Sequence, residues 1–303
     1  MADQKFDAIV VGSGAGGGTA ARVLTQHGQR VIVFEKGPLK RPDDFLPYDE
    51  LHYSEHKALI PSKQSDPMMY VDPATQVAKK VERWWIGNMV GGATMLWEAN
   101  LPRYTAEDFN LLSFMPNPPA GTSQVNWPWS YEEFQPWFEL AEWEWGVSGQ
   151  AATPGSRHMQ EPTRPGYQFP MPPLRPHAST PFLQWAFGLA GMLPFSSPRG
   201  INTRTYGGRP ACPYCGFCQG YGCAVNDRAS STNTVLATAL RSGLCTLKSE
   251  HCVTRILYKN GVVEGVAYKD SPTGQEFVIK APRVFVSIQA IESARLFLIS
   301  GIP

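Results

Sequence analysis

A glycine-rich turn between two apolar strands constrains the fold of this chain more than any other feature. The run Gly12-Ser13-Gly14-Ala15-Gly16-Gly17 fits the pattern G-x-G-x-x-G, and an apolar strand at residues 6–12 leads into it. A helix at 18–27 and a second apolar strand at 30–35 follow the turn. This order predicts a right-handed parallel crossover in an α/β, Rossmann-like nucleotide-binding fold.

The residues of this motif are predicted to hold a dinucleotide. Gly12 permits the tight turn, Gly14 lets the backbone approach a pyrophosphate, and Gly17 lets helix and strand pack closely. Ala15 lies between them, where the helix N-terminus and its dipole favour the pyrophosphate. Glu35 ends the second strand, where a carboxylate accepts hydrogen bonds from ribose hydroxyls. The alternative is a glycine turn without a ligand. It is disfavoured because the strand before the turn, the helix after it and the acid Glu35 all fit a nucleotide-binding site.

The chain that follows Glu35 favours FAD over NAD. NAD-binding domains usually continue with another helical crossover, whereas residues 38–67 are polar and irregular. The sheet resumes only near residue 251. FAD is therefore the predicted nucleotide.

The last third of the chain predicts the rest of the nucleotide-binding core. A helix is expected at 228–242 and an antiparallel meander of three strands at 251–280. A buried strand at 283–288 and a helix from near Ala290 come next. Since a domain rarely ends on a fresh strand and helix, we expect the sequence to be cut within a fold, with a C-terminal substrate domain missing.

A long insertion separates the two parts of this core. Residues 105–147 predict two helices, the second capped by Ser130 with Glu133 three residues on. The Pro-rich stretch 148–204 predicts an ordered surface excursion because it still carries aromatic and aliphatic residues. The predicted division is a nucleotide core of 1–40 and 228–303, a flavin-loop and helical insertion of 41–204, and a Cys-rich loop of 205–227.

Four segments carry a family resemblance that covers nearly all of the chain. They are the glycine motif with Glu35, the loop Gly91-Gly92-Ala93-Thr94, the segment 127–149 and the segment 290–302. Together they resemble the N-terminal portion of the glucose-methanol-choline (GMC) oxidoreductases, in the branch with sugar and gluconate dehydrogenases. The resemblance implies that Gly91, Gly92 and Thr94 contact the pyrophosphate or flavin, and that Val253 meets the adenine through its backbone. The residues alone leave an ordinary turn at Gly91-Gly92 as the alternative.

The resemblance also implies an activity. It implies an FAD-dependent oxidoreductase that oxidises the CH–OH group of a sugar, sugar acid or polyol by hydride transfer to flavin. The expected acceptor is not oxygen but a cytochrome or quinone, reached through an electron-acceptor subunit. Leu96 stands where some members carry a His that bonds to the flavin, so FAD is expected to be non-covalent. The family's catalytic His lies in the C-terminal half, so no catalytic residue is assigned here. Two alternatives stay open, a non-catalytic FAD-binding or electron-transfer module and an O2-using alcohol oxidase.

Four of the six cysteines crowd into one short run. Cys212, Cys215, Cys218 and Cys223 follow C-x2-C-x2-C-x4-C, close to the spacing of bacterial ferredoxins, and glycines within the run supply turns. An iron–sulfur cluster is one hypothesis for this run, and structural thiols or disulfides are the other. Zinc is less favoured because only two residues separate the middle pair.

Charge and hydropathy exclude several classes of protein. The chain has 27 basic and 26 acidic residues and no like-charge run, which argues against a nucleic-acid partner. The sequence contains no run of about 18 apolar residues, so no transmembrane segment is predicted. The first strand begins by Phe6, which leaves no room for a signal peptide. A cytoplasmic location is expected, or a periplasmic one only if a partner subunit carries the chain there.

Overall fold

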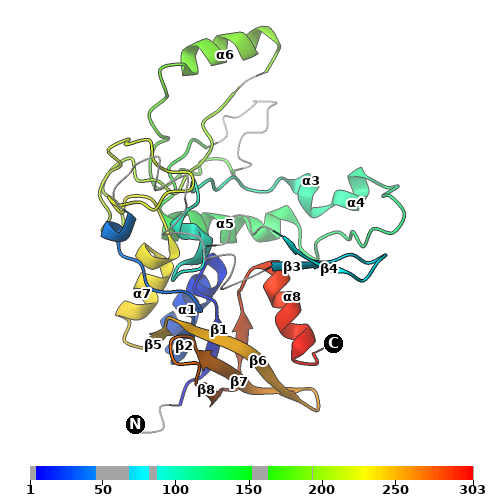
Figure 1. Ribbon diagram of the computed structural model, residues 1–303. Coiled ribbons are helices and arrows are strands. Elements are labelled where there is room, and N and C mark those ends of the chain that lie inside the picture. Colours follow the sequence, from blue (N-terminus) through cyan, green and yellow to red (C-terminus); the bar gives the residue numbers. More distant parts are fainter. Residues whose placement is uncertain (1–4, 46–67, 82–86, 152–162, 193, 303) are drawn as a thin grey trace. The chain divides into compact units, whose positions relative to one another are not determined.

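The computed structural model describes residues 5–45, 68–81, 87–151, 163–192 and 194–302 (Figure 1). Contacts divide the chain into two compact units. The first unit is Met1–Glu98, Cys215–Asn226 and Ser230–Pro303, and the second is Ala99–Tyr214 and Asp227–Ala229.

A parallel sheet with the strand order β5-β2-β1-β9 forms the centre of the first unit. Its strands are β1 (Ala8–Val11), β2 (Val31–Phe34), β5 (Cys245–Lys248) and β9 (Val284–Val286). Every residue of β1 and β2 is buried, and a continuous apolar run of this kind is typical of parallel strands covered on both faces. The predicted strands β1, β2 and β9 are confirmed, whereas β5, on the edge beside β2, was not predicted.

Helices cover one face of this sheet. They are α1 (Ala15–Gln26) and α7 (Val235–Arg241). Val10 and Val33 of the sheet pack with Ala21 of α1 and Leu236 of α7 in one buried cluster. The alternation of side chains along each strand therefore directs one set of residues towards the helices.

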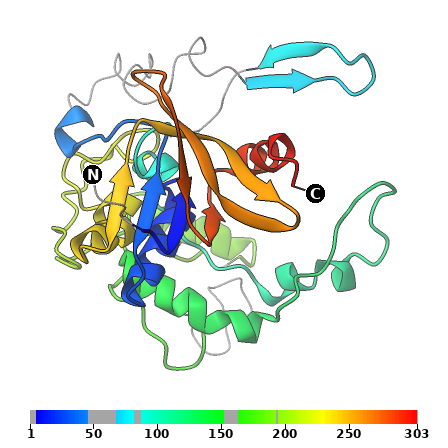
Figure 2. The same ribbon diagram turned by 90° about the horizontal axis from the view of Figure 1, so that it is seen from below.

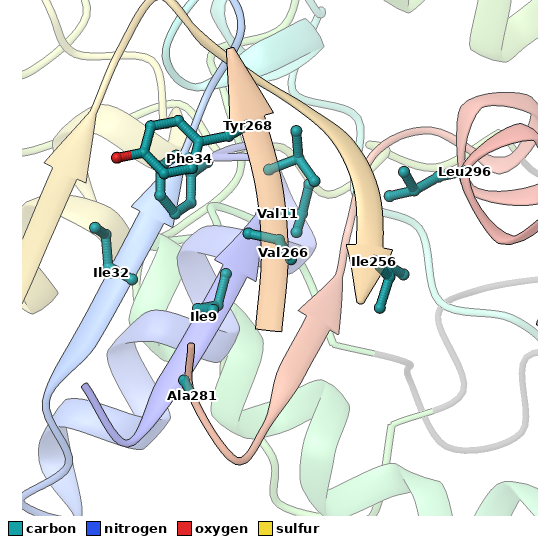
Figure 3. Close-up of a cluster of buried hydrophobic side chains, with 10 residues drawn as sticks. Ile9, Val11, Ile32, Phe34, Ile256, Val266, Tyr268, Ala281 and Leu296 are labelled. Atoms are coloured by element: carbon teal, nitrogen blue, oxygen red, sulfur yellow. The ribbon is translucent and has the colours of Figure 1, made fainter. Parts of the chain in front are cut away.

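An antiparallel meander covers the opposite face, as the orange strands across the blue ones show in Figure 2. It consists of β6 (His251–Lys259), β7 (Val262–Asp270) and β8 (Glu276–Lys280). Ile9 and Phe34 of the sheet pack with Val266 and Tyr268 of the meander and with Leu296 of α8 (Figure 3). The ring centroids of Phe34 and Tyr268 lie 4.5 Å apart. The predicted three-stranded meander is confirmed.

The helix α8 (Ala290–Ile299) begins where the sequence predicts it. Its N-terminus is capped by Gln289, whose side-chain oxygen accepts hydrogen bonds from the N–H groups of Ile291 and Glu292 at 2.9 and 3.2 Å. Such a cap satisfies donors that the first turn of a helix leaves without partners.

Several elements of the first unit differ from the predictions. The helix α1 begins at Ala15 rather than at residue 18, because the glycine turn itself forms its first turn. The helix expected at 228–242 is divided into η3 (Ser231–Asn233) and α7. The hairpin of β3 (Met68–Val71) and β4 (Ala78–Val81) was not predicted. Two further short helices are η1 (Pro42–Phe45) and η2 (Gly92–Met95).

The second unit contains helices and irregular segments. Its helices are α3 (Ala106–Phe109), α4 (Leu111–Phe114), α5 (Tyr131–Trp145) and α6 (Thr180–Leu189). The predicted capping box is confirmed, since Glu133 N–H donates to Ser130 Oγ and Ser130 N–H donates to Glu133 Oε2. The helix α6 lies in the Pro-rich stretch 148–204, for which an ordered surface excursion but no particular helix was predicted.

A buried ion pair holds the second unit together. Arg103 donates from Nε to Glu142 Oε1 at 2.6 Å and from Nη2 to Oε2 at 2.7 Å. The hydroxyl of Tyr167 also donates to Glu142 Oε2, and the Arg103 guanidinium lies 4.9 Å from the Tyr167 ring centroid. Burial, and then the bond to Glu142, raise the pKa of Tyr167. Burial lowers the pKa of Arg103, but its hydrogen bonds to Glu142 and Tyr131 outweigh this and raise it.

Candidate functional site

The order of the parallel strands indicates that a ligand would bind at the carboxyl end of β1. Since β2 and β9 lie on opposite sides of β1, the sheet has a topological switch point there. Ligands of open α/β sheets bind outside the carboxyl ends of the strands at such a point. Gly12, Glu35 and Ser287 directly follow β1, β2 and β9, so all three lie at this edge.

Gly12 and Gly17 are positions that exclude a side chain. Gly12 has a φ of 95°, and a Cβ there would lie 2.4 Å from the carbonyl oxygen of Ser287. A Cβ at Gly17 would lie 1.9 Å from the carbonyl oxygen of Gly12. The turn after β1 can therefore close onto the helix and onto β9 only with glycine at both positions.

Gly14 is different, because it faces open space. It is the N-cap of α1 without a side-chain cap, and a Cβ there would have only Gly91 O as a neighbour, at 4.0 Å. Ala15 and Gly16 are exposed. The first N–H groups of a helix have no intrahelical partners, and with the helix dipole they favour an anion. This end of α1 therefore fits the pyrophosphate of a dinucleotide.

The loop at Gly91–Thr94 lies against the same end of α1. Gly91 and Gly92 both have positive φ values, of 90° and 56°. A Cβ on Gly92 would lie 3.4 Å from Gly14 Cα, so two glycine segments far apart in the sequence approach each other closely. This juxtaposition gives a ligand access to backbone from both segments.

The hydroxyl of Thr94 holds this loop in shape. It donates to the carbonyl oxygen of Gly91 at 2.6 Å and accepts from the N–H of Ser231 at 3.0 Å. A hydroxyl has a single donor, so this one has none left for a cofactor. We therefore expect any hydrogen bond donated by Thr94 to FAD to come from its backbone. Ser231 is a part of the site that the sequence did not indicate.

Glu35 is buried at the end of β2 with three hydrogen-bond donors around it. Ser13 donates to its Oε2 from the backbone N–H at 3.1 Å and from Oγ at 2.6 Å, and Gly37 N–H donates to Oε1 at 3.0 Å. An ionised carboxylate has about four acceptor positions. One position therefore remains on Oε1, enough for one ribose hydroxyl. Ser13 was missed because the motif leaves its position open.

Val253 lies on the strand that starts beside Glu35. The N–H of His251, the first residue of β6, donates to the carbonyl oxygen of Glu35 at 2.9 Å. The side chain of Val253 is buried in the cluster between the sheet and the meander. The register of β6 with β7 shifts directly after Val253, as at a β-bulge. Its backbone contact with adenine stays a prediction.

The structure does not support the predicted iron–sulfur cluster at Cys212, Cys215, Cys218 and Cys223. Among the residues that the structure describes, no three or more His, Cys, Asp or Glu side chains are arranged to hold a metal ion. All six cysteines are described, and none forms a disulfide. Cys212 belongs to the second unit and the other three to the first.

One glycine of this run, Gly222, has a packing role. A Cβ on Gly222 would lie 2.0 Å from the ring of Phe45, so the ring packs directly on the backbone. The N–H of Gly220 donates to the carbonyl oxygen of Leu96 at 2.9 Å. Leu96 and Phe45 share a buried cluster with Met89 and Met95. Gly220 and Gly222 therefore lie against residues of this buried cluster.

Iron analysis tests this correction. We expect the purified protein to contain no stoichiometric iron or acid-labile sulfide, because the cysteine run supplies no converging set of thiolates. The measurement is colorimetric iron and sulfide determination on protein purified without oxygen. About four iron atoms per chain would restore the cluster hypothesis.

The three histidines that the structure describes, His27, His177 and His251, have structural contacts or are exposed. His27 is exposed at the end of α1, with Nδ1 2.8 Å from the carbonyl oxygen of Val23. His177 is exposed beside Ser179. His251 packs beside the rings of Phe34 and Tyr268, with its ring centroid 6.5 and 5.7 Å from theirs. The other three, His52, His56 and His158, lie outside the described residues.

A glycine turn at the switch point of a parallel sheet, with an acid after the second strand, defines a dinucleotide-binding domain. Residues 7–43 match the family model described as an FAD binding domain. The chain therefore carries an FAD-binding domain. Residues 177–303 match the family model described as GMC oxidoreductase, and the predicted resemblance to this family is confirmed.

Relatives and solved structures agree with this assignment. The gluconate 2-dehydrogenase flavoprotein of Pantoea cypripedii is 29% identical over 99% of this chain and 53% of its own length. The 2-methyl-1,2-propanediol dehydrogenase of Mycolicibacterium austroafricanum is 31% identical over 99% of this chain and 51% of its own. The chain thus spans about half the length of these relatives.

The fold is shared with solved structures of oxidoreductases at low sequence identity. An FAD-dependent oxidoreductase from Chaetomium thermophilum aligns with a TM-score of 0.64 at 17% identity, over 98% of this chain and 48% of that chain. A pyridoxine 4-oxidase from Mesorbium loti aligns with a TM-score of 0.58 at 19% identity, over 98% of this chain and 52% of that chain.

In the part of the chain that the structure describes, no helix is long and apolar enough to cross a membrane.

Proposed function

We propose that this chain is the FAD-binding part of an oxidoreductase that oxidises a CH–OH group of a sugar, sugar acid or polyol. The observation that carries the proposal is the approach of Gly92 to Gly14 at the exposed N-terminus of α1. It brings the backbone of two segments next to the place that one elongated phosphate-containing ligand would occupy. The names of two relatives, a gluconate dehydrogenase and a propanediol dehydrogenase, support the substrate class.

Each part of the proposed site has a physical task. The first turn of α1 binds the pyrophosphate through N–H groups and the helix dipole. Glu35 accepts one ribose hydroxyl, and its negative charge disfavours a 2′-phosphate. Gly91 and Gly92 keep side chains away from the cofactor. When bound, FAD supplies the hydride acceptor for alcohol oxidation.

FAD is proposed to be held without a covalent bond. Leu96 is aliphatic and buried beside Phe45, Met89 and Met95, so it offers no nucleophile to the flavin. In an acid-precipitation experiment, the released flavin should therefore remain in the supernatant. Flavin that stays with the precipitate would contradict this part of the proposal.

The proposed enzyme is a dehydrogenase, because both relatives named above are dehydrogenases. An oxidase that uses O2 is the second candidate. It is favoured by two Streptomyces relatives, a 6'''-hydroxyparomomycin C oxidase at 29% identity and a paromamine 6'-oxidase at 28%. The acceptor separates the two candidates, since a dehydrogenase reduces a quinone or a dye faster than oxygen.

Anaerobic reduction of the bound flavin tests the proposal. We expect the flavin absorbance of the purified full-length protein to bleach on addition of gluconate, aldoses or polyols, because a hydride from the CH–OH carbon reduces it. Reoxidation is then followed with oxygen and, separately, with a quinone analogue. A protein that binds FAD but is bleached by no alcohol would support a non-catalytic FAD module. A protein without affinity for FAD would refute the proposed site.

A further inference from the structure

The side chain of Ser13 connects two parts of the proposed FAD site that are far apart in the sequence. Its hydroxyl donates to Glu35 Oε2 at 2.6 Å and accepts from the backbone N–H of Gly91 at 2.9 Å. Ser13 is fully buried, so water does not compete for these bonds. One oxygen atom therefore joins the acid of β2 to the loop at Gly91–Thr94.

The direction of each bond makes this connection specific. Glu35 receives donors only, from Ser13 and Gly37, so its carboxylate orients the Ser13 O–H group. With its proton directed at Glu35, the Ser13 oxygen presents its lone pairs to Gly91. The Gly91 N–H is then occupied and lies in a fixed position. Alanine at position 13 would leave this buried N–H without a partner, which is costly.

We propose that Ser13 is a positioning residue that couples the adenosine side of the FAD site to the flavin loop. The proposal rests on the proposed function, in which Glu35 accepts a ribose hydroxyl and the Gly91–Thr94 loop faces the flavin half. Through Ser13, the geometry of the carboxylate sets the geometry of the loop. The binding of FAD therefore depends on both Glu35 and the Gly91–Thr94 loop, whereas the binding of ADP depends mainly on Glu35.

Binding of two probes to three variants measures the coupling. Ser13→Ala should weaken ADP binding by about tenfold, because Glu35 loses a charge-assisted hydrogen bond that orients it. It should weaken FAD binding by about a further tenfold, because Gly91 is released as well. Glu35→Gln keeps one carbonyl oxygen that can still accept the Ser13 hydroxyl and so leave the loop in place. It should therefore weaken the binding of both probes by the same factor. The matched control is Thr19→Ala, since the exposed Thr19 hydroxyl of α1 only donates to Ala15 O at 2.8 Å, and neither probe should be affected.

The ratio of the FAD loss to the ADP loss is the deciding quantity, because a general loss of stability lowers both affinities together. Titrations use the purified full-length protein after removal of flavin, with calorimetry for ADP and flavin fluorescence for FAD. If Ser13→Ala does not fold, Ser13→Cys replaces it, because a thiol is only a weak donor. Equal losses for the two probes, or no loss, overturn the coupling. Wild-type protein that binds neither probe refutes the proposed function itself.

Discussion

Alanine in place of Gly17 should destabilise the first unit and abolish FAD binding. The added Cβ would lie 1.9 Å from the carbonyl oxygen of Gly12, a backbone atom that cannot rotate away. The helix α1 would have to move off β1, at a cost of about 3 kcal/mol or more. The measurements are the melting temperature, which should fall by roughly 10 °C, and FAD binding by fluorescence.

Two other glycine variants serve as controls for Gly17→Ala. Gly14→Ala should keep the melting temperature, because its Cβ meets no protein atom closer than 4.0 Å, but its methyl group would occupy the space of the pyrophosphate. Its FAD affinity should fall about tenfold to hundredfold. Gly188→Ala on α6 has no neighbour within 4 Å and should change neither property. A stable, FAD-binding Gly17→Ala protein would contradict the close packing of α1 on the glycine turn.

Truncation of Glu142 to alanine should be the most damaging change in the second unit. It leaves the Arg103 guanidinium buried without its carboxylate and removes the acceptor of the Tyr167 hydroxyl. Breaking a buried pair from one side costs about 3–5 kcal/mol. Chemical denaturation followed by tryptophan fluorescence should show this loss.

An exposed ion pair provides the comparison for Glu142→Ala. Glu264 accepts from Lys280 at 2.9 Å on the surface of the meander, and Glu264→Ala should leave the denaturation midpoint unchanged. The double variant Arg103→Ala with Glu142→Ala should lose less stability than the two single losses together, because the residues share one interaction. Strict additivity would show that the two side chains act independently.

Local sequence patterns predicted those strands and turns whose own residues indicate how they pair or pack. The strands β1 and β2 are continuous apolar runs, and the meander has a recognisable turn at Asn260-Gly261, where both residues have positive φ. In contrast, every residue of β5 is only half-buried. It is a strand because β2 offers it a partner, which no local pattern contains.

The sequence predicted those residues of the candidate site at which only glycine fits sterically. It did not predict the polar side chains whose hydrogen-bond partners are distant in the sequence. An added Cβ at Gly12 or Gly17 would clash with backbone atoms, and the glycine motif, whose geometry is known, already predicts that both positions need glycine. Ser13 and Ser231 matter through bonds to Gly91 and Thr94, and these partners are remote in the sequence. The cysteine run shows the opposite case, since its spacing suggested ligands while the backbone of Gly222 packs on Phe45.

The pairing of Ile9 with Val284 has a consequence for how the protein is made. On the ribosome, one edge of β1 stays without its neighbour until β9 has emerged, and an unpaired edge invites pairing with other chains. Closing so long a loop also slows folding, because its entropy is lost before the contact is gained. The edge of the sheet at the end of β1, where FAD is proposed to bind, is therefore completed only after β9 has been synthesised.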